Sequence, residues 1–264
     1  MDLSTIGGLA AALLIISAVM IMDGGSPLEL FAVPQAILLT LGGSLVASMI
    51  TQPLDVTLKF PVFLKIVFFS KKESVHAVIE QMTVMADKAR REGLLALEEE
   101  SKKIDDPFLR KGIMMVVDGI EPAQVRAILE LEIKSMVERH ERGISFFNSG
   151  GGFAPTFGII GTVMGLIVVL KELSNPDKLA KSIASAFLAT LWGLLSANLI
   201  WIPMGAKLAT RNHEEVSYRH MLLEGIISLQ AGENPRLIRD KLNVFLPPNQ
   251  REGDVKNKKG EAKT

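Results

Sequence analysis

The sequence predicts an all-α integral membrane protein with four transmembrane helices and a helical cytoplasmic domain. The first observation is the distribution of charge: the chain has 29 basic and 29 acidic residues, yet four long stretches contain none. The second is that apolar residues between these stretches recur at intervals of three and four, which is typical of helices. The four charge-free stretches are residues 3–22, 30–51, 146–170 and 182–204.

Each charge-free stretch is long enough to cross a membrane. A helix that spans ~30 Å of hydrocarbon needs roughly 20 predominantly apolar residues. The last two stretches are rich in Gly, Ala, Ser and Thr, but a helix in a soluble core rarely runs this far without a charge. The first stretch is not interpreted as a signal peptide. A signal peptide begins with basic residues, whereas here the apolar stretch is preceded by Asp2 and by no basic residue, and a second apolar stretch follows closely.

The basic residues predict the orientation. All of the 29 Lys and Arg residues except Lys171, Lys178 and Lys181 lie in residues 52–145 or 205–264. Because cytoplasmic loops carry an excess of Lys and Arg, both long polar segments are expected in the cytoplasm. Both termini are then cytoplasmic as well.

The chain is therefore divided into five parts. Residues 1–51 hold transmembrane helices 1 and 2, and residues 52–145 form a cytoplasmic helical domain. Residues 146–204 hold transmembrane helices 3 and 4, followed by C-terminal cytoplasmic helices in residues 205–248. Residues 249–264 are rich in Lys, Glu, Gly and Asn and have almost no apolar residue, so they are expected to be a disordered tail.

Helical periodicity organises the polar segments. Apolar positions predict helices over residues 75–89, 125–137 and 216–229. The second of these is expected to continue into the third span. Asp106 directly precedes a proline and is expected to cap a helix, and residues 232–235 predict a turn.

The composition argues against an enzyme. The chain has no cysteine, which excludes disulfides, thiolate catalysis and cysteine metal sites. The glycines at 150–152 precede a span rather than a strand-to-helix turn, so no phosphate-binding loop is predicted. A net charge of zero gives no argument for nucleic acid. We expect no cofactor and no metal site, because His76 and His140 sit in helical patterns with no second ligand at metal spacing. The histidines are interpreted as surface or interface residues; the other two are His213 and His220.

The membrane interior carries no ionisable residue, although ion pathways usually do. A partner must therefore supply any carboxylate. Thr162 and Thr190 lie beside rows of small residues, where helices approach closely in lipid, and their hydroxyls are able to solvate an ion. The rows are expected to show where that partner packs, and the alternative left open is that they only pack the third and fourth spans together. The rows are Gly158, Gly161 and Gly165, and Ser185, Ala189, Gly193 and Ala197.

Two prolines mark the ends of these spans. Pro155 lies at the start of the third span and Pro203 at the end of the fourth, each toward the cytoplasmic side. Proline removes a backbone donor and loosens the helix. Each is either a boundary residue or a hinge between the membrane and cytoplasmic parts.

Several motifs occur together. The fourth stretch contains AFLATLWGLL (186–195) followed by Pro203, and the third contains Ala154 and Pro155 followed by GIIGTVMG (158–165). The polar segments contain RREGLLALE (90–98), VDG (117–119) and GENPR (232–236). In this order, the motifs resemble the A subunits of the bacterial flagellar stator, the MotA/PomA family. The resemblance covers the chain from Met1 to about Pro247.

The resemblance implies a bacterial inner-membrane protein that forms a homopentamer around a pair of B-type subunits, MotB or PomB. Each B subunit has one membrane helix and a periplasmic peptidoglycan-binding domain, and one of its aspartates carries the ion. That arrangement fits the absence of a carboxylate in these four spans. Ion flow is expected to turn the ring of A subunits, whose cytoplasmic part drives the rotor protein FliG.

The resemblance also assigns residues. Arg90 and Glu98 match the charged pair that meets FliG, and their spacing of eight is expected to place them two turns apart near one helix face. Pro155 and Pro203 match two prolines linked to coupling. Thr190 matches the threonine near the ion-bearing aspartate.

Thr162 bears on the identity of the ion. Sodium-type members resemble this chain in having threonine there, whereas many proton-type members have alanine. Sodium-type members often have two successive threonines in the fourth span, and here the first position is Ala189. Na+ is favoured and H+ remains open.

Two other functions are considered. One is an ion-driven energiser of outer-membrane processes of the TolQ/ExbB type, whose members have three spans; the two stretches before residue 52 and the 90–98 segment favour the stator. The other is a membrane scaffold with no ion path.

Overall fold

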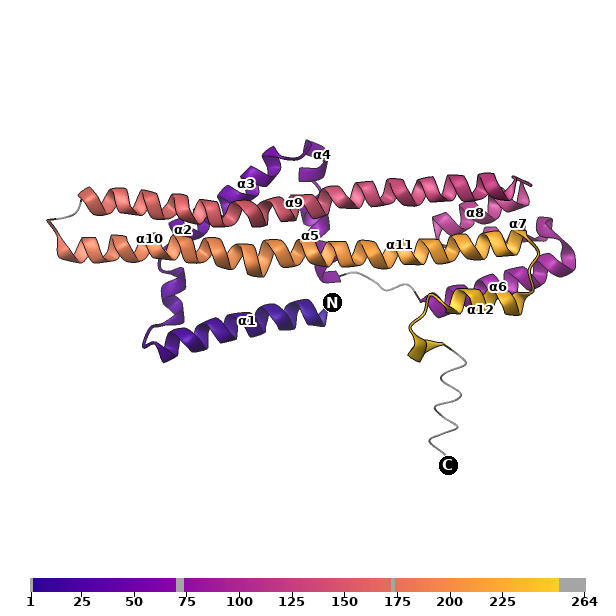
Figure 1. The fold of residues 1–264 in the computed structure, drawn as a ribbon, viewed down its shortest axis with the longest axis horizontal. Helices are drawn as coiled ribbons and strands as arrows, with labels where there is room; N and C mark the ends of the chain where they lie inside the picture. Colours follow the sequence, from indigo (N-terminus) through magenta and orange to yellow (C-terminus); the bar gives the residue numbers. More distant parts are fainter. Residues whose placement is uncertain (1, 70–73, 172–173, 252–264) are drawn as a thin grey trace, which may run out of the picture. The chain divides into compact units, whose positions relative to one another are not determined.

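The structure is a computed structural model that describes residues 2–69, 74–171 and 174–251, and all of its regular elements in these residues are helical (Figure 1). In chain order they are α1 (Leu3–Met22), the 3-10 helix η1 (Pro27–Phe31), α2 (Pro34–Ile37), the π-helix η2 (Leu38–Gly42), α3 (Gly43–Ile50), α4 (Leu54–Thr57), α5 (Phe60–Phe69), α6 (Val75–Glu92), the 3-10 helix η3 (Leu94–Ala96), α7 (Leu97–Ser101), α8 (Pro107–Val117), α9 (Pro122–Lys171), α10 (Pro176–Ser196), the π-helix η4 (Ala197–Trp201), α11 (Ile202–Gln230), α12 (Pro235–Asn243) and the 3-10 helix η5 (Pro248–Gln250).

The chain divides into two compact units, and each unit is built from two separate parts of the sequence. The first unit comprises residues 1–71 and 139–211, and the second comprises residues 72–138 and 212–264. Helices α9 and α11 each contribute one end to each unit. The prediction that the helix over 125–137 continues into the third span is confirmed, because α9 is a single helix of 50 residues.

Within the described residues, three helices are long and apolar enough to cross a membrane: Leu3–Met22, Pro122–Lys171 and Lys178–Gln230. They contain the first, third and fourth predicted spans. The second predicted span, residues 30–51, begins with the 3-10 helix η1, and its continuous apolar helix is the shorter Pro34–Ile50. At 1.5 Å per residue that helix is roughly 25 Å long, somewhat less than the ~30 Å hydrocarbon layer.

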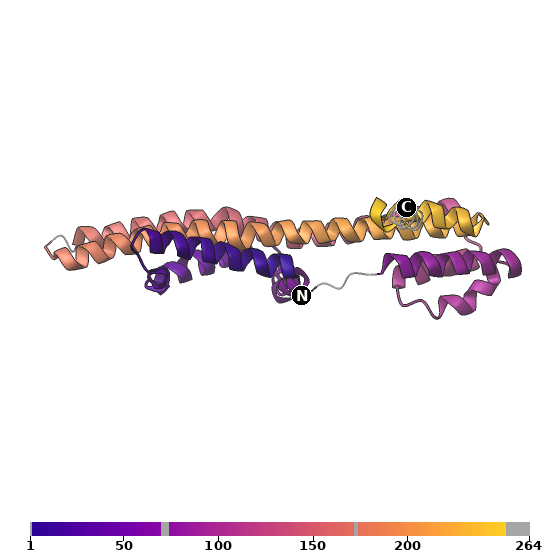
Figure 2. The same cartoon turned by 90° about the horizontal axis from the view of Figure 1, so that it is seen from below.

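The first unit is built around close packing of α10 on the C-terminal part of α9, which lie side by side in Figures 1 and 2. A Cβ atom added at Gly193 would lie 2.8 Å from the carbonyl oxygen of Ala154, and one at Gly158 would lie 3.0 Å from that of Ala189. The rows of small residues therefore face each other within one chain. The expectation that they present a docking face for a partner is wrong, and the alternative that they pack the two spans together is confirmed.

Aromatic side chains attach neighbouring segments to this helix pair. Trp192 of α10 donates its Nε1–H to the carbonyl oxygen of Leu30 at 2.7 Å and meets the Phe31 ring edge-on at 5.7 Å, which attaches η1 to α10. Further along the chain, the Phe60 ring of α5 lies 5.5 Å from the ring of Phe146 and 6.4 Å from that of Trp201. Such pairs bury large apolar areas and set ring geometry.

The second unit has its own hydrophobic core. Asp106 caps α8, as predicted, by accepting hydrogen bonds from the backbone N–H groups of Phe108 at 2.8 Å and Leu109 at 3.0 Å. Arg219 of α11 donates to both oxygens of the same carboxylate, so the cap is also tied to α11. Each α-helix around this core supplies at least one buried residue to it; examples are Met82 (α6), Leu109 (α8), Leu129 (α9), Ile226 (α11) and Leu242 (α12).

The other predicted elements of the polar segments are also present. The helix over 75–89 is α6, whose buried residues include Ile79, Met85 and Ala89. Residues 216–229 lie within α11, and the turn at 232–235 ends with Asn234 as the cap of α12. Most of the predicted disordered tail, residues 252–264, lies outside the described residues, while Asn249 and Gln250 belong to η5.

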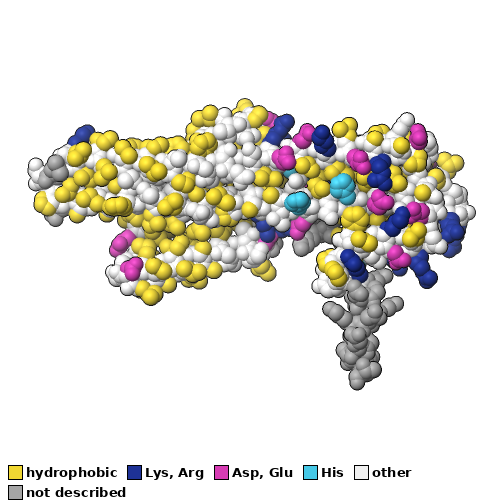
Figure 3. Space-filling model, in the orientation of Figure 1, with side chains coloured by type: hydrophobic (Ala, Val, Ile, Leu, Met, Phe, Trp, Pro, Cys, Tyr) yellow, Lys and Arg dark blue, Asp and Glu magenta, His cyan; other side chains and the backbone are white. Residues whose placement is uncertain are grey.

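The two units differ in surface chemistry, as Figure 3 shows. Hydrophobic side chains cover α10 and the C-terminal half of α9, where Ile159, Phe187 and Leu194 are exposed. Charged side chains gather over the second unit. An exposed apolar surface of this extent is costly in water but matches the hydrocarbon layer of a membrane.

Candidate functional site

The hydroxyl groups of Thr162 on α9 and Thr190 on α10 are in direct contact. Thr162 Oγ1 also lies 3.1 Å from the carbonyl oxygen of Gly158, on its own helix, and 3.0 Å from that of Ala186, on the facing helix. A hydroxyl has one proton and two acceptor lone pairs. The two available protons are shared within this group of oxygens, so acceptor lone pairs remain on the hydroxyls.

The structure therefore brings together both residues predicted for the ion path. Both threonines are half-buried. The stretches that carry them, residues 146–170 and 182–204, contain no charged residue. A negative charge beside these hydroxyls must come from outside these two stretches. By itself the pair offers neutral oxygens, which can replace the water ligands of a cation and cannot titrate in the physiological range.

Ala189 has a packing role that the sequence did not reveal. Its side chain is 3% exposed, and a Cβ added at Gly161 would lie 2.6 Å from the Ala189 Cβ. The residue before Thr190 therefore faces the contact between α9 and α10. A larger side chain there would have to fit between two closely packed backbones, which costs free energy.

The two predicted coupling prolines occupy different helical contexts. Pro155 lies inside α9, which continues on both sides of it. Because proline has no N–H, the carbonyl of Gly151 cannot accept the usual helical hydrogen bond from residue 155. Pro203 is exposed and is the second residue of α11, the helix that directly follows the π-helix Ala197–Trp201. Local widening of the helix into a π segment is often found at functional sites.

Arg90 and Glu98 lie on two different helices. Arg90 is in the last turn of α6 and Glu98 in the first turn of α7. Helix α6 ends because Gly93 adopts φ 86° and ψ 165°, a conformation essentially restricted to glycine. The expectation that the two residues share one face of a continuous helix is therefore wrong. Their separation is set by the Gly93 break and the η3 turn.

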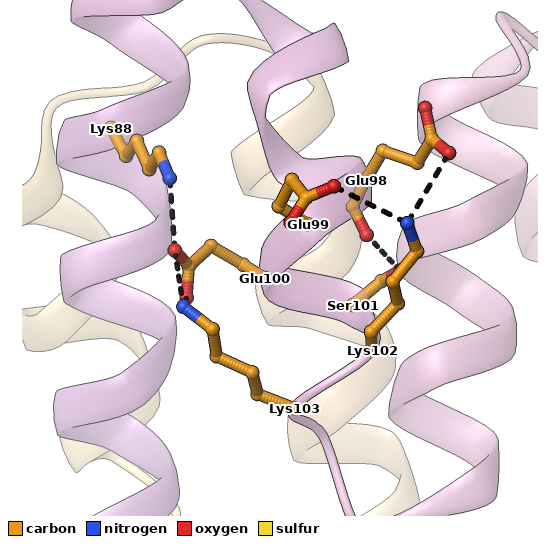
Figure 4. Close-up of polar contacts among 7 residues, drawn as sticks. All are labelled: Lys88, Glu98, Glu99, Glu100, Ser101, Lys102 and Lys103. Atoms are coloured by element: carbon orange, nitrogen blue, oxygen red, sulfur yellow. Dashed lines mark hydrogen bonds and ion pairs between the residues drawn. The ribbon is translucent and has the colours of Figure 1, made fainter.

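A network of ion pairs holds α7 against α6 (Figure 4). Glu100 accepts from Lys88 of α6 at 2.8 Å and from Lys103 at 3.2 Å. Lys88 lowers the pKa of the Glu100 carboxyl, and Glu100 in turn raises the pKa of the Lys88 ammonium. This network fixes the helix that carries Glu98.

Arg90 and Glu98 themselves are more available. Glu98 is exposed and lies 3.8 Å from Lys102, which is also 3.3 Å from Glu99. Arg90 is exposed and makes no ion pair within the described part of the chain. Surface pairs as long as the Glu98–Lys102 contact contribute little. Both charges can therefore engage a partner without breaking a strong internal contact.

Residues 100–221 match the sequence profile of the MotA/TolQ/ExbB proton channel family. The Motility protein A of Treponema phagedenis is 40% identical to this chain over 248 residues, which are 94% of this chain and 95% of that protein. The chain belongs to the MotA family. The Chemotaxis protein PomA of Vibrio alginolyticus, 33% identical over 95% of this chain and 98% of its own length, is a further relative of this MotA-family chain.

The fold agrees with this family assignment. The flagellar MotAB stator complex from Bacillus subtilis contains a chain that superposes with a TM-score of 0.88 at 35% identity, over 95% of this chain and 98% of that one. This MotA-family chain is a flagellar stator ion-channel subunit and a multi-pass membrane protein. Because the likeness to motility proteins extends well beyond residues 100–221, it supports the stator rather than the TolQ/ExbB alternative. The family is a channel family and not an enzyme family.

Two sets of ion pairs in this MotA-family chain were not predicted from the sequence. The pairing of Lys88 with Glu100 has no local signal, because twelve positions and the Gly93 break separate the two residues. The neighbouring Lys103–Glu100 pair, three positions apart, does follow a spacing rule. The ion pairs of Asp2 are equally non-local.

Among the described residues, no group of three His, Cys, Asp or Glu side chains is placed to hold a metal ion.

Proposed function

We propose that this chain forms a homopentamer around two B-type subunits (MotB or PomB) and that ion flow through the complex turns the ring against the rotor protein FliG. The observation that carries this proposal is the contact between Thr162 and Thr190 in helices without a carboxylate. Two neutral hydroxyls can coordinate an ion but cannot carry a proton by titration. The B subunit supplies the missing aspartate.

The proposed seat of the B-subunit helix is the apolar surface beside the threonine pair. Ile159 and Leu166 lie one turn before and after Thr162 on α9, and they are 59% and 47% exposed. Phe187 and Leu194 flank Thr190 on α10 in the same way and are 69% and 47% exposed. A membrane helix packed there would bring its carboxylate to the hydroxyls.

Sodium is the favoured ion. Two hydroxyl oxygens in contact, with backbone carbonyls nearby, offer several neutral ligands to a hard cation. Ala189 weighs against sodium in the comparison with sodium-type members, but its buried position in the contact between α9 and α10 explains its small size without reference to the ion. H+ is the alternative ion.

The proposed topology has four membrane helices in the bacterial inner membrane and both termini in the cytoplasm. Pro155 and Pro203 act as coupling residues between the ion path and the second unit, because each interrupts the backbone hydrogen bonding of a helix that reaches that unit. Arg90 and Glu98 form the contact with FliG through their exposed charges.

The test uses a swimming strain that lacks its own stators and carries the matching rotor. This chain is expressed together with its B subunit, and swimming speed is measured against external sodium at fixed proton motive force. Speed that rises with sodium and saturates is the expected result. Speed that is indifferent to sodium would assign the ion as a proton. Failure to swim, with both subunits present in the membrane, would contradict the stator proposal.

A further inference from the structure

Asp2 is the centre of a cluster of charges at the start of α1. Its carboxylate accepts from Lys207 Nζ at 2.6 Å and from Arg211 Nη2 at 2.7 Å, both on α11. Ser4 Oγ donates to it at 2.6 Å. The backbone N–H of Asp2 donates to the carbonyl oxygen of Phe68, on α5, at 3.0 Å. One residue thus connects three segments of the first unit.

The cluster is shielded from water. The side chains of Asp2, Lys207 and Arg211 are only 11%, 24% and 16% exposed. The hydrogen bond from Lys207, followed by that from Ser4, strongly lowers the pKa of the Asp2 carboxyl. Charge-assisted hydrogen bonds of this length are stronger than neutral ones. The carboxylate is therefore a persistent anchor rather than a transient surface contact.

Beyond this cluster, α1 is loosely attached. None of its residues is buried. A groove of about 340 Å³ separates α1 from the π-helix and the start of α11, with Gly8 and Leu9 on one side and Leu199 and Pro203 on the other. The ion pairs of Asp2 therefore connect the start of α1 to α11 beside this groove, which Lys207 also lines.

The position of the anchor on α11 is informative. Lys207 and Arg211 follow Pro203 by four and eight residues, which is about one and two helical turns. They belong to the stretch of α11 that directly follows the π-helix and the proline. A helix interrupted at this point can bend. When the helix bends, an anchor just beyond the interruption holds the segment of α11 after Pro203 in place.

We propose that Asp2 is a positioning residue of the stator, which holds the α11 segment after Pro203 against the first membrane helix. The inference rests on the proposed coupling role of Pro203. With the anchor in place, movement at the ion path is transmitted along α11. Without it, the segment after Pro203 swings relative to α1, and ion passage produces less rotation.

The test separates transmission from ion flow and from assembly. Asp2→Asn removes the charge but keeps a good helix cap, and Lys207→Gln removes one partner while leaving Arg211. Asp23→Asn is the matched control, because Asp23 caps the other end of the same helix, is exposed and makes no ion pair within the described residues. Each variant is expressed with the B subunit, and three quantities are measured: the amount of complex in the membrane, ion conduction per complex, and stall torque per complex.

The expected result is a loss of stall torque in Asp2→Asn and, to a smaller extent, in Lys207→Gln, at unchanged ion conduction per complex. Asp23→Asn should match the wild type, and Asp2→Glu should recover torque. Unchanged torque in Asp2→Asn would overturn the inference, as would a loss of torque matched by an equal loss of conduction. If Asp2→Asn does not assemble, the ratio of torque to conduction in Lys207→Gln decides in the same way. Failure of the wild-type complex to conduct ions would instead contradict the proposed function.

Discussion

Thr162 and Thr190, on two antiparallel helices, hold their hydroxyl groups in contact, and Thr162 also reaches the backbone carbonyl of Ala186 on the facing helix. The contact is possible because glycines at 158 and 193 let the two backbones approach. Close packing and ion coordination therefore depend on the same few residues, and substitutions can separate the two.

The first prediction concerns the hydroxyl of Thr162. Thr162→Ala removes one hydrogen-bonding group, which costs about 1 kcal/mol, so the chain should still fold and assemble. Because the methyl group cannot replace a water ligand of sodium, swimming at low external sodium should be strongly impaired. Thr162→Ser should retain most of the activity. An unchanged sodium dependence in Thr162→Ala would count against a sodium path at this pair.

The second prediction tests the close approach of α9 and α10. In Gly193→Ala, the new Cβ would lie 2.8 Å from the backbone oxygen of Ala154, which cannot move aside as a flexible side chain would. We expect a destabilisation of ~1–3 kcal/mol, typical of overpacking, seen as a lower thermal unfolding midpoint of the purified complex. Gly152→Ala is the control, because no atom outside its own helix backbone lies within 4 Å of its Cβ position. Equal midpoints for both variants would argue against the packing described.

The third prediction concerns the rotor contact. Arg90→Glu should weaken rotation without changing expression, because Arg90 is exposed and makes no ion pair in the described residues. An opposite charge introduced on FliG should partly restore swimming. Since Arg90 and Glu98 lie on separate helices, exchanging their charges does not recreate the same surface. Full motility of Arg90→Glu combined with Glu98→Lys would contradict the assignment.

The fourth prediction concerns how the contribution of the Lys88–Glu100 pair to stability depends on pH. The pKa of Glu100 is lowered in the folded chain, so its contribution to stability is complete above the ordinary glutamate value of about 4.3 and is lost as the pH falls through the lowered pKa. The pKa of Lys88 is raised, so its contribution is complete below the ordinary lysine value of about 10.4 and is lost as the pH rises through the raised pKa.

The corresponding measurement compares the unfolding midpoints of the wild type and Glu100→Gln across pH. Their difference should be constant between pH ~5 and ~9 and should shrink in acid, where both carry a neutral group at position 100. Glu99→Gln is the control, because the Glu99 side chain is 78% exposed and, among the described residues, pairs only with the exposed Lys102. A difference that persists in strong acid would show that the effect is not the charge.

The local features of this protein could be predicted from sequence because they depend on neighbouring residues. A charge-free stretch of about 20 residues predicts a span whatever it packs against. The Asp106 cap and the turn before Asn234 are likewise short-range hydrogen-bonding patterns. The helix break between Arg90 and Glu98 was missed although Gly93 is visible in the sequence, because a glycine within a helical pattern does not by itself reveal its φ angle.

By itself, the sequence determined that this chain is helical and apolar enough to enter a membrane, and that its spans contain no carboxylate. Only the tertiary structure decided that the small-residue rows face each other, that Thr162 meets Thr190, and that Asp2 pairs with Lys207. The physical reason is that periodicity and charge act over one or two helical turns. Contacts between helices depend on which faces meet, and that is settled by the packing of the whole unit.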